Sequence, residues 1–318
     1  MTTTTAVTAA PGPGAVTTAA ATGQQRPKRK RELLSLYLAI SPFYIIFAAF
    51  GIFPIIFSIY LSFHAWDGIG SMKYVGWGQY GYLIHDNEFW YSLLHTVEIW
   101  VISTVPMLML ALVIAFLLNT QIRFKTAYRV AYFIPNITSI VAIAIIFGSI
   151  FANNFGIVNS FLHALGGGQV QWLTDPWGIR VAIAAMVVWR WTGYNAIIYL
   201  AGLQAINSDL FEAARVDGAS QVQTFFRVTI PLLRPVILFT VIMSTIGGLQ
   251  IFTESQVLIP GNSGGTNNAG ETMVLYLYKQ AFTQQQFGYG AALGWALFLI
   301  ILIASIINWR LVQLRGRD

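Results

Sequence analysis

Six long apolar runs do most to limit what this chain can fold into. They lie near residues 36–63, 93–118, 129–151, 179–203, 230–252 and 289–309. A helix that crosses a hydrocarbon core about 30 Å thick needs roughly 20 mostly apolar residues, so each run is long enough for one crossing. We therefore predict an all-α integral membrane protein with six transmembrane helices and with both termini on the same side. Two spans contain residues that interrupt helices, Pro54 in the first and Gly247–Gly248 in the fifth.

The shortage of charge excludes a soluble fold. Charged residues make up 9% of the chain and hydrophobic residues 56%, whereas a soluble domain is typically about a quarter charged. The 18 basic and 12 acidic side chains cannot cover the surface of a globule of this size, so much of that surface faces something other than water. The absence of cysteine excludes thiol catalysis, cysteine-ligated metal and disulfides.

The basic residues indicate which side the termini occupy. Fourteen of the eighteen Lys and Arg residues fall in the two tails and in the loops on the side of the termini. Lys73, Arg180 and Lys279 lie in or beside the opposite loops, and Arg190 lies within a span. Because cytoplasmic loops carry an excess of Lys and Arg, both termini are predicted to be cytoplasmic. The net charge of +6 is therefore a topology signal, and no nucleic-acid partner is expected.

The chain divides into four predicted segments. The first 25 residues carry no charge and are mostly Thr, Ala, Pro and Gly, a composition that cannot offset its chain entropy by burying apolar surface. The predicted segments are a disordered, basic-ended cytoplasmic tail at 1–35, the first transmembrane helix with the first external loop at 36–92, a permease-like core of five transmembrane helices at 93–310, and a cytoplasmic C-terminal tail at 311–318.

Motifs for catalysis and for metal binding are absent from the sequence. There is no G-x-x-x-x-G-K-[ST] phosphate loop and no Gly-Lys dipeptide, so the chain has no visible means of hydrolysing ATP. Its four histidines lack metal-ligand spacing such as H-E-x-x-H. We therefore predict that the chain is not an enzyme, with no catalytic residue, no metal site and no cofactor of its own.

The segment 207–220, between the fourth and fifth spans, has the pattern of two short helices with a sharp bend. Asp209 followed three residues later by Glu212 resembles a capping box and predicts a helix start there. Gly218 can end that helix in a left-handed conformation, and Ser220 opens a second short helix. The small residues at the bend let another surface approach the backbone closely. These residues alone leave two interpretations open, a docking knob or an interfacial helix that rests on the bilayer.

The same segment resembles the EAA loop of binding-protein-dependent ABC importer permeases. The family pattern is EAA, three residues, Gly, nine residues and I-x-L-P, and this chain has Glu212-Ala213-Ala214, Gly218 and Val228-Thr229-Ile230-Pro231. Val228 replaces the Ile and Ile230 replaces the Leu, both conservatively. The resemblance implies an ATPase-coupling loop at 207–231, with Asp209, Glu212, Ala213, Ala214, Asp217, Gly218, Ala219 and Pro231 as its candidate residues.

Other stretches resemble the sugar-importing branch of that family, the relatives of the maltose and glycerol-phosphate permeases. They include Ser41-Pro42-Phe43, Tyr132-Phe133-Ile134-Pro135, Gly156-Ile157-Val158-Asn159 and Gly264-Gly265, where the usual Gly-Gly-Pro is Gly-Gly-Thr. Together the similar stretches cover roughly residues 36–310. The implied fold is that of a type I ABC importer permease.

The resemblance implies the transmembrane permease subunit of an ATP-driven sugar importer in the bacterial cytoplasmic membrane, with a di- or oligosaccharide as the solute. The chain would form half of the translocation path in a heterodimer with a second permease subunit, and the path would open to either side in turn. Two copies of a cytoplasmic ATPase subunit, which use ATP and Mg²⁺, would bind beneath and receive the EAA helix in a cleft. An extracytoplasmic solute-binding protein would deliver the sugar to the outer loops.

Polar residues at membrane depth are the candidates for contact with a solute. A charge at the centre of a membrane helix costs about 2.5–3.5 kcal/mol on insertion scales, so it usually faces a cavity or a partner. Arg190 has aromatic neighbours in the sequence, and Gln250 shares a helical face with Glu254. Aromatic faces combined with fixed hydrogen-bond donors suit a sugar. The candidate path residues are Arg190, Trp191, Tyr194, Asn195, Gln250 and Glu254.

Alternatives stay open for both the residues and the function. Arg190 can instead extend to the interface or pair with an acid such as Glu98 or Glu254, with the tryptophans in an interfacial belt. Gln250 and Glu254 can instead form a structural polar contact. The alternative function is an ion-coupled secondary carrier or a non-transporting membrane scaffold. Such a carrier needs intramembrane acids and repeated halves, and only Glu98 and Glu254 approach that requirement.

Overall fold

The computed structural model describes residues 26–119, 123–259 and 264–314. Contacts divide the chain into two compact units, residues 1–56 and 57–318. The described residues are mostly helical, and five helices are long and apolar enough to cross a membrane. One further pair of helices passes the same test together but is bent by 94°. With that pair counted as one span, the described chain has the six predicted crossings.

The first unit is helical wherever it is described. Helix α1 spans Arg26–Phe47, the π-helical turn η1 follows at Ala48–Ile52, and α2 spans Phe53–Ser62, which ends in the second unit. Large apolar side chains of this unit are exposed, with Phe43 at 67% and Phe50 at 82%. A helix that is apolar all round needs an apolar environment, and for an exposed helix of this length that environment is a membrane.

Helix α1 begins inside the segment predicted to be a disordered tail. That tail was placed at 1–35, but the chain is helical from Arg26 onward, so the prediction is wrong for its last ten residues. Arg, Lys, Glu and Leu are good helix formers, and they fill the sequence immediately before the first apolar run. Residues 1–25 lie outside the described residues.

The interruption predicted at Pro54 takes the form of the π-helical turn η1. The Phe53 N–H donates to the carbonyl of Ala48, five residues back, in place of the usual four. Proline has no N–H, and its ring clashes with the carbonyl four residues earlier. One wider turn placed just before Pro54 gives the ring room without ending the span.

The second unit contains the remaining elements. In chain order they are β1 (His64–Ala65), β2 (Lys73–Tyr74), α3 (Gly78–His85), α4 (Asn87–Leu118), α5 (Lys125–Ile137), α6 (Ile140–Ile150), α7 (Ile157–Ala164), α8 (Pro176–Gln204), α9 (Ser208–Val216), α10 (Gln221–Thr224), the π-helix η2 (Phe225–Thr229), α11 (Ile230–Gly248), α12 (Thr253–Leu258), the 3₁₀ turn η3 (Thr266–Asn268), α13 (Met273–Tyr278), the π-helix η4 (Lys279–Thr283) and α14 (Phe287–Leu314). β1 and β2 pair antiparallel, with His64 opposite Tyr74. α14 continues past 311, where the C-terminal tail was predicted to begin.

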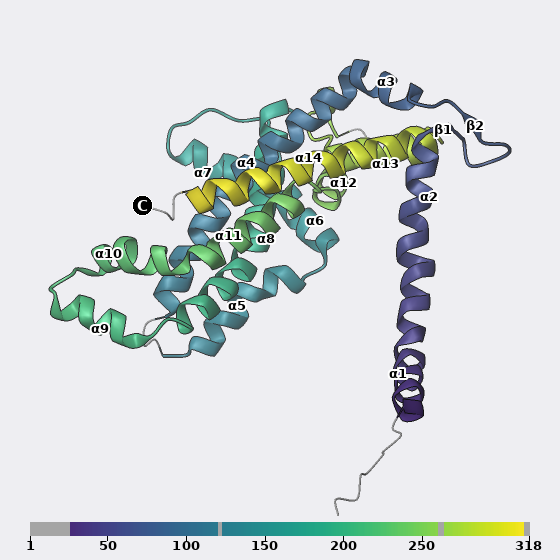
Figure 1. Ribbon diagram of the computed structural model, residues 1–318. Coiled ribbons are helices and arrows are strands. Elements are labelled where there is room, and N and C mark those ends of the chain that lie inside the picture. The colour runs from purple at the N-terminus through teal and green to yellow at the C-terminus, as the bar shows by residue number, and fades with distance from the viewer. Residues whose placement is uncertain (1–25, 120–122, 260–263, 315–318) are drawn as a thin grey trace, which may run out of the picture. The chain divides into compact units, whose positions relative to one another are not determined.

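Helices α4 and α8 form the centre of the second unit and pack along each other, with α5 and α11 beside α8 (Figure 1). Ala111 and Ala115 of α4 meet Ala196 and Tyr199 of α8 in one buried cluster. Small side chains of this kind let two membrane helices approach closely. A second cluster joins α8 to α6 and α12, and a third joins α4 to α13 and α14.

The third span is bent, which the sequence did not predict. α5 ends at Ile137, where the N–H and Oγ1 of Thr138 both donate to the carbonyl of Ile134, at 3.1 and 2.8 Å. Thr138 itself is extended, with φ −73° and ψ 145°. Pro135 contributes to the break, because it cannot donate the hydrogen bond that would continue α5. A single apolar run therefore forms two helices at an angle of 94°.

The fifth span ends where the glycine pair predicted an interruption. α11 ends at Gly248, and the chain turns before α12. A Cβ on Gly248 would lie 2.2 Å from Cδ1 of Trp100 on α4. The glycine therefore permits the close approach of α11 to α4, and its position sets where the chain leaves the helix.

Candidate functional site

A cavity of about 480 Å³ lies where α4, α8, α11 and α12 meet. All six residues predicted to lie on a solute path line it. The complete lining is Thr104, Met107, Val187, Arg190, Trp191, Tyr194, Asn195, Met243, Ser244, Gly247, Gly248, Gln250, Ile251, Thr253 and Glu254. The structure thus brings two separate stretches of the sequence, 190–195 and 250–254, to one site.

An ion pair spans this cavity from α8 to α12. Nη1 of Arg190 lies 3.2 Å from Oε1 of Glu254, and Glu254 is only 8% exposed. The guanidinium carbon of Arg190 lies 5.4 Å from the centre of the Trp191 ring, a cation–π distance. Pairing of Arg190 with Glu254 was one of the alternatives left open, and the same pair lines the cavity. The two interpretations therefore do not exclude each other.

The aromatic and amide groups beside Arg190 are held in fixed positions. The rings of Trp191 and Tyr194 meet edge to face, with 5.7 Å between their centroids. Nδ2 of Asn195 donates to the carbonyl of Trp191 at 3.0 Å. Asn195 is buried, whereas Tyr194 is 41% exposed. The cavity thus combines a buried polar wall with an aromatic side chain near its opening.

The sequence reasoning missed the residues that α4 and α11 contribute to this cavity. Thr104 and Met107 lie one turn apart on α4, and Met243 and Ser244 lie one turn before the glycine pair on α11. These are uncharged residues in apolar spans, so no local signal separates them from ordinary packing residues. Only their spacing, one helical turn from each other or from Gly247, places them on common faces.

A second set of ion pairs ties the third external segment to the outer ends of α4 and α8. Arg180 of α8 pairs with Glu98 of α4, and its Nε donates to the carbonyl of Ala269 at 3.1 Å. Nζ of Lys279 lies 3.2 Å from Oε1 of Glu271, which is 1% exposed. Burial raises the pKa of Glu271, and the charge of Lys279 opposes that rise. Glu98, the other acid considered as a partner for Arg190, is therefore paired elsewhere.

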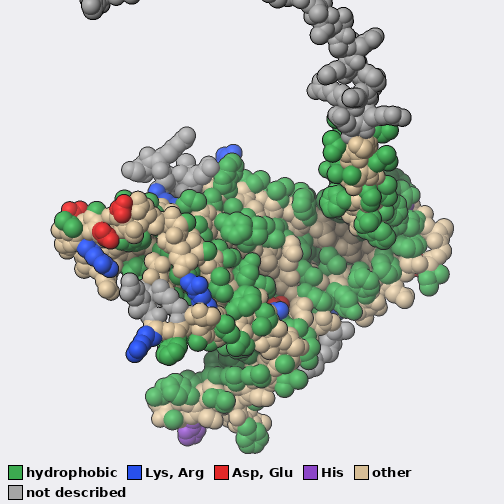
Figure 2. All heavy atoms as spheres, turned by 90° about the horizontal axis from the view of Figure 1, so that it is seen from below, with side chains coloured by type: hydrophobic (Ala, Val, Ile, Leu, Met, Phe, Trp, Pro, Cys, Tyr) green, Lys and Arg blue, Asp and Glu red, His purple; other side chains and the backbone are tan. Residues whose placement is uncertain are grey.

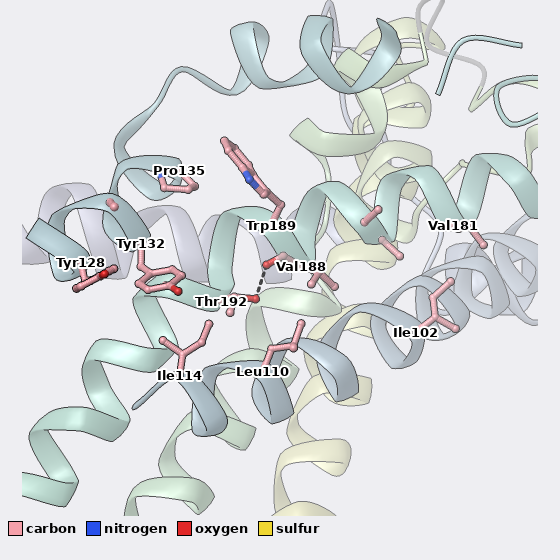
Figure 3. A pocket seen from close by; sticks show the side chains of 14 residues that line it. Ile102, Leu110, Ile114, Tyr128, Tyr132, Pro135, Val181, Val188, Trp189 and Thr192 are labelled. Carbon is pink, nitrogen blue, oxygen red and sulfur yellow. Dashed lines mark hydrogen bonds between the residues drawn. The ribbon is translucent and has the colours of Figure 1, made fainter. Parts of the chain in front are cut away.

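A larger cavity of about 810 Å³ lies between α4, α5 and α8 (Figure 3). Figure 3 shows Tyr128, Tyr132 and Pro135 of α5 on one side, with Leu110 and Ile114 of α4 below them. None of its described lining residues is charged. The close packing of α5 and α8 beside it depends on a glycine, because a Cβ on Gly193 would lie 1.7 Å from the carbonyl oxygen of Tyr132. This cavity lacks the convergent polar groups of the first.

The predicted coupling loop forms two short helices joined by a left-handed glycine. Gly218 has φ +74°, and the N–H groups of Gly218 and Ala219 donate to the carbonyls of Arg215 and Ala214. This is the hydrogen-bond pattern of a Schellman motif, for which glycine is preferred. The predicted bend between two helices is therefore confirmed at Gly218.

The start of α9 differs from the prediction. The capping box predicted for Asp209 and Glu212 is wrong, because Asn207 is the capping residue and accepts from the Asp209 N–H at 3.0 Å. Asn caps helices as well as Asp does, and this register places the Asp209 carboxylate in the first turn, where it favours the helix dipole. A capping box is found instead at the start of α10, between Ser220 and Gln223.

Helices α9 and α10 project together from the second unit (Figure 1). In Figure 2, acidic side chains gather at the left-hand tip, where these helices lie, while hydrophobic side chains cover much of the remaining face. Asp209, Glu212 and Asp217 lie on the accessible surface of this projection, and Ala214 is buried against the rest of the chain. The apolar side chain of Leu210 is 46% exposed and that of Val216 88%. The projection thus offers small and apolar groups within a ring of charge.

Pro231 lies in the first turn of α11, directly after the π-helix η2. The Ile230 N–H donates to the carbonyl of Phe225, five residues back. Helix and π-turn together form one continuous span, Gln221–Gly248. The coupling loop is therefore joined to the fifth span without a break. The described residues hold no group of three or more His, Cys, Asp or Glu side chains that could bind a metal ion.

Comparison with known proteins identifies what this chain resembles. Residues 81–315 match the family described as binding-protein-dependent transport system inner membrane component. The chain is 38% identical to the lactose transport system permease protein LacF of Rhizobium radiobacter, over 86% of this chain and 92% of that protein. It is 35% identical to the arabinooligosaccharides transport system permease protein AraP of Bacillus subtilis, over 86% and 87% of the two chains.

A solved structure shares the fold. One chain of a bacterial alginate ABC transporter, in complex with an alginate pentasaccharide-bound periplasmic protein, matches with a TM-score of 0.77 at 22% identity. The match covers 92% of this chain and 98% of that one.

The family resemblance predicted from Glu212, Gly218 and Pro231 and the all-helical membrane fold are thereby confirmed. Components of this kind are non-catalytic, multi-span subunits of the inner membrane, as predicted. The match extends over most of the chain, from 81 to 315, and the chain belongs to the family of binding-protein-dependent ABC transporter permeases.

Proposed function

We propose that this permease subunit carries a sugar, a di- or oligosaccharide, through the cavity that holds the Arg190–Glu254 pair. The observation that carries the proposal is the convergence of all six candidate residues on one cavity of about 480 Å³. Arg190 lies near the middle of α8, far from either end of that span. Charged groups at membrane depth are costly and are typical of solute paths.

The chemistry of the cavity suits a saccharide. A sugar ring has apolar C–H faces that stack on aromatic rings, here Trp191 and Tyr194, and hydroxyls that exchange hydrogen bonds with amide, hydroxyl and guanidinium groups. Asn195, Gln250 and Arg190 supply such groups. The names of the two relatives, which refer to lactose and to arabinooligosaccharides, support the same solute class.

The partners follow from what the chain provides and from what it lacks. With Tyr194 open to the exterior of the chain, the cavity is half of a path, and we infer that a second permease subunit supplies the other half as a heterodimer. The sequence has no phosphate loop, so two copies of a separate ATPase subunit hydrolyse ATP with Mg²⁺. A solute-binding protein delivers the sugar from outside, a partner in keeping with the periplasmic protein named in the alginate transporter complex.

Coupling in this proposal runs through α9 and α10. The ATPase receives the exposed face of α9 around Glu212 and Ala213, and its closure moves the projection as a unit. Because α10, η2 and α11 form one continuous helix, that movement is passed to Gly247 and Gln250 at the cavity. The path then opens to each side of the membrane in turn.

An ion-coupled carrier is less well supported. Such a carrier needs an intramembrane acid that is free to bind and release its ion. The two acids that approached this requirement, Glu98 and Glu254, are each paired with an arginine of α8.

Two neighbouring tryptophans give a matched test. Trp191 lines the cavity beside Arg190, whereas Trp189 lies on the same helix and packs against Phe147. In proteoliposomes that contain the complete importer, Trp191→Ala should reduce sugar uptake about tenfold, because stacking of a ring on an aromatic side chain is worth on the order of 1–3 kcal/mol. Trp189→Ala should keep uptake close to that of the unsubstituted complex. Equal uptake by the two variants, with both complexes assembled, would contradict the assignment of the path.

A further inference from the structure

We propose that the Arg190–Glu254 ion pair keeps the cavity electrically neutral and so makes uncharged saccharides, in preference to acidic ones, the solutes that it admits. This inference rests on the proposed function, because it concerns the selectivity of the same cavity.

The first argument is the charge balance of the lining. Arg190 and Glu254 are the only Lys, Arg, Asp or Glu residues among the described lining residues. They lie 3.2 Å apart and are mostly buried, with 20% and 11% of their side chains exposed. Their charges therefore cancel within the cavity. Other groups supplied by α4, α8, α11 and α12 are hydroxyls, amides, thioethers and aromatic rings.

The charges nearest to the cavity on the packed elements are also compensated. Glu98 of α4 pairs with Arg180 of α8, and Glu271 pairs with Lys279. Neither pair lines the cavity. Among the described residues, the field inside the cavity is therefore set by the Arg190–Glu254 pair and by neutral dipoles.

The second argument is a donor of Arg190 that has no partner. Within the described part of the chain, Nε of Arg190 is buried without a hydrogen-bond partner, and Nη1 is engaged by Glu254. A buried donor left unpaired is costly. A neutral sugar hydroxyl or ring oxygen can accept from such a donor while the ion pair stays intact.

An acidic saccharide faces a different balance. Its carboxylate forms its strongest contact with an arginine by bidentate pairing, but here that contact requires displacement of Glu254. The displaced carboxylate would then be buried without a partner, which is strongly unfavourable. A saccharide carboxylate that leaves the pair in place instead adds an uncompensated charge beside Glu254. Both routes disfavour acidic solutes as long as Glu254 is ionised and paired.

The test uses the absence of cysteine from this chain. Ser244→Cys places one thiol in the cavity lining, where it reacts with anionic sulfonatoethyl methanethiosulfonate or with the cationic trimethylammonium-ethyl reagent. The rate ratio of the two reagents reports the local charge, measured on this subunit by mass in the complete reconstituted importer. Backgrounds are the unsubstituted chain, Glu254→Gln, Arg190→Gln and the double variant, and Glu98→Gln is the matched control outside the cavity.

We expect Glu254→Gln to raise the anion-to-cation rate ratio about tenfold and Arg190→Gln to lower it about tenfold, because each leaves one unit charge uncompensated at close range. The double variant and Glu98→Gln should stay within about twofold of the unsubstituted ratio on the same grounds. A ratio that Glu254→Gln and Glu98→Gln change equally, or not at all, would overturn the proposal.

Protection of the same thiol by saccharides tests selectivity directly. Lactose, maltotriose and arabinotriose serve as neutral probes, and trigalacturonate serves as the acidic probe. We expect at least one neutral probe, and not trigalacturonate, to slow labelling in the intact pair, and trigalacturonate to protect once Glu254 is replaced by Gln. Equal protection by neutral and acidic probes in the intact pair overturns the selectivity alone. No protection by any probe, together with full uptake by Trp191→Ala, overturns the proposed path and the selectivity with it.

Discussion

Arg190 illustrates how a single residue in a span can serve packing and function together. Its charge is compensated by Glu254 at 3.2 Å and its guanidinium lies against Trp191, so the membrane cost of the charge is offset. The sequence predicted that Arg190 faces a cavity or a partner, and both are observed. It also predicted Tyr194 and Asn195, because i, i+4 spacing places residues on a common face. Thr104 and Ser244 could not be predicted, because their contribution depends on how α4 and α11 cross α8.

Gly193 should tolerate no side chain, by our first residue-scale prediction. A Cβ there would lie 1.7 Å from the carbonyl oxygen of Tyr132, and a carbonyl in a helix cannot move aside cheaply. Gly193→Ala should therefore destabilise the chain by about 1–3 kcal/mol, the usual cost of overpacking. The measurement is the thermal unfolding midpoint of the detergent-purified complex.

The matched control for Gly193→Ala is Gly148→Ala. Gly148 lies in helix α6, and nothing lies within 4 Å of the position that a Cβ would take there. Alanine should be neutral at this position or stabilising by about 0.5–1 kcal/mol, because it favours helix. Equal unfolding midpoints for the two variants would contradict the close contact between α5 and α8.

At the scale of elements, the sequence predicted most helices but not how they bend or begin. The bend between α9 and α10 followed from Gly218, because only a few residues adopt that conformation. The start of α9 was misplaced because Asn207 and Asp209 are equally good capping residues. The 94° bend of the third span could not be predicted, since its apolar run is uninterrupted and Pro135 alone is compatible with a kinked helix.

Gly218 should contribute conformation and not contacts to the coupling loop. It has φ +74°, and nothing lies within 4 Å of a Cβ placed on it. Gly218→Ala should therefore cost about 1–2 kcal/mol of local strain without any clash. We expect faster hydrogen exchange in α9 and α10 and roughly tenfold weaker retention of the ATPase.

Gly166→Ala is the control for that variant. Gly166 has φ +78° and equally open surroundings, but it lies in an external loop after α7. It should undergo the same local strain and leave ATPase retention unchanged. The coupling role of α9 and α10 fails if both variants retain the ATPase as the unsubstituted chain does.

The external segment that carries Glu271 should become more stable as the pH falls. Burial raises the pKa of Glu271 above its ordinary value of 4.5, so the folded segment binds a proton more tightly than the unfolded one. Stability therefore rises as the pH falls through the raised pKa towards the unfolded value, and it is lowest where both states are ionised. Hydrogen exchange in residues 264–283 should slow over that window. Glu271→Gln should remove the dependence; its persistence in that variant would show that another group titrates.

At the scale of the whole molecule, the sequence predicted the class of protein better than its arrangement. Charge shortage and six apolar runs were enough to predict a multi-span membrane fold, and the spacing from Glu212 to Pro231 was enough to predict the family. The cavity, by contrast, arises where four helices meet, two of them more than a hundred residues apart in the sequence. That meeting depends on close contacts at Gly193 and Gly248, whose partners the sequence does not name.

The central claim is that this cavity is the solute path and is opened to the two sides in turn by the ATPase. The most direct measurement is the labelling of Ser244→Cys in oriented proteoliposomes by a membrane-impermeant thiol reagent added to one side at a time. The account predicts that the accessible side changes when ATP and vanadate hold the ATPase closed. Met109→Cys, at a position 65% exposed on the apolar surface of α4, should stay unreactive throughout. Labelling of Ser244→Cys from neither side, or from the same side in both states, would contradict it.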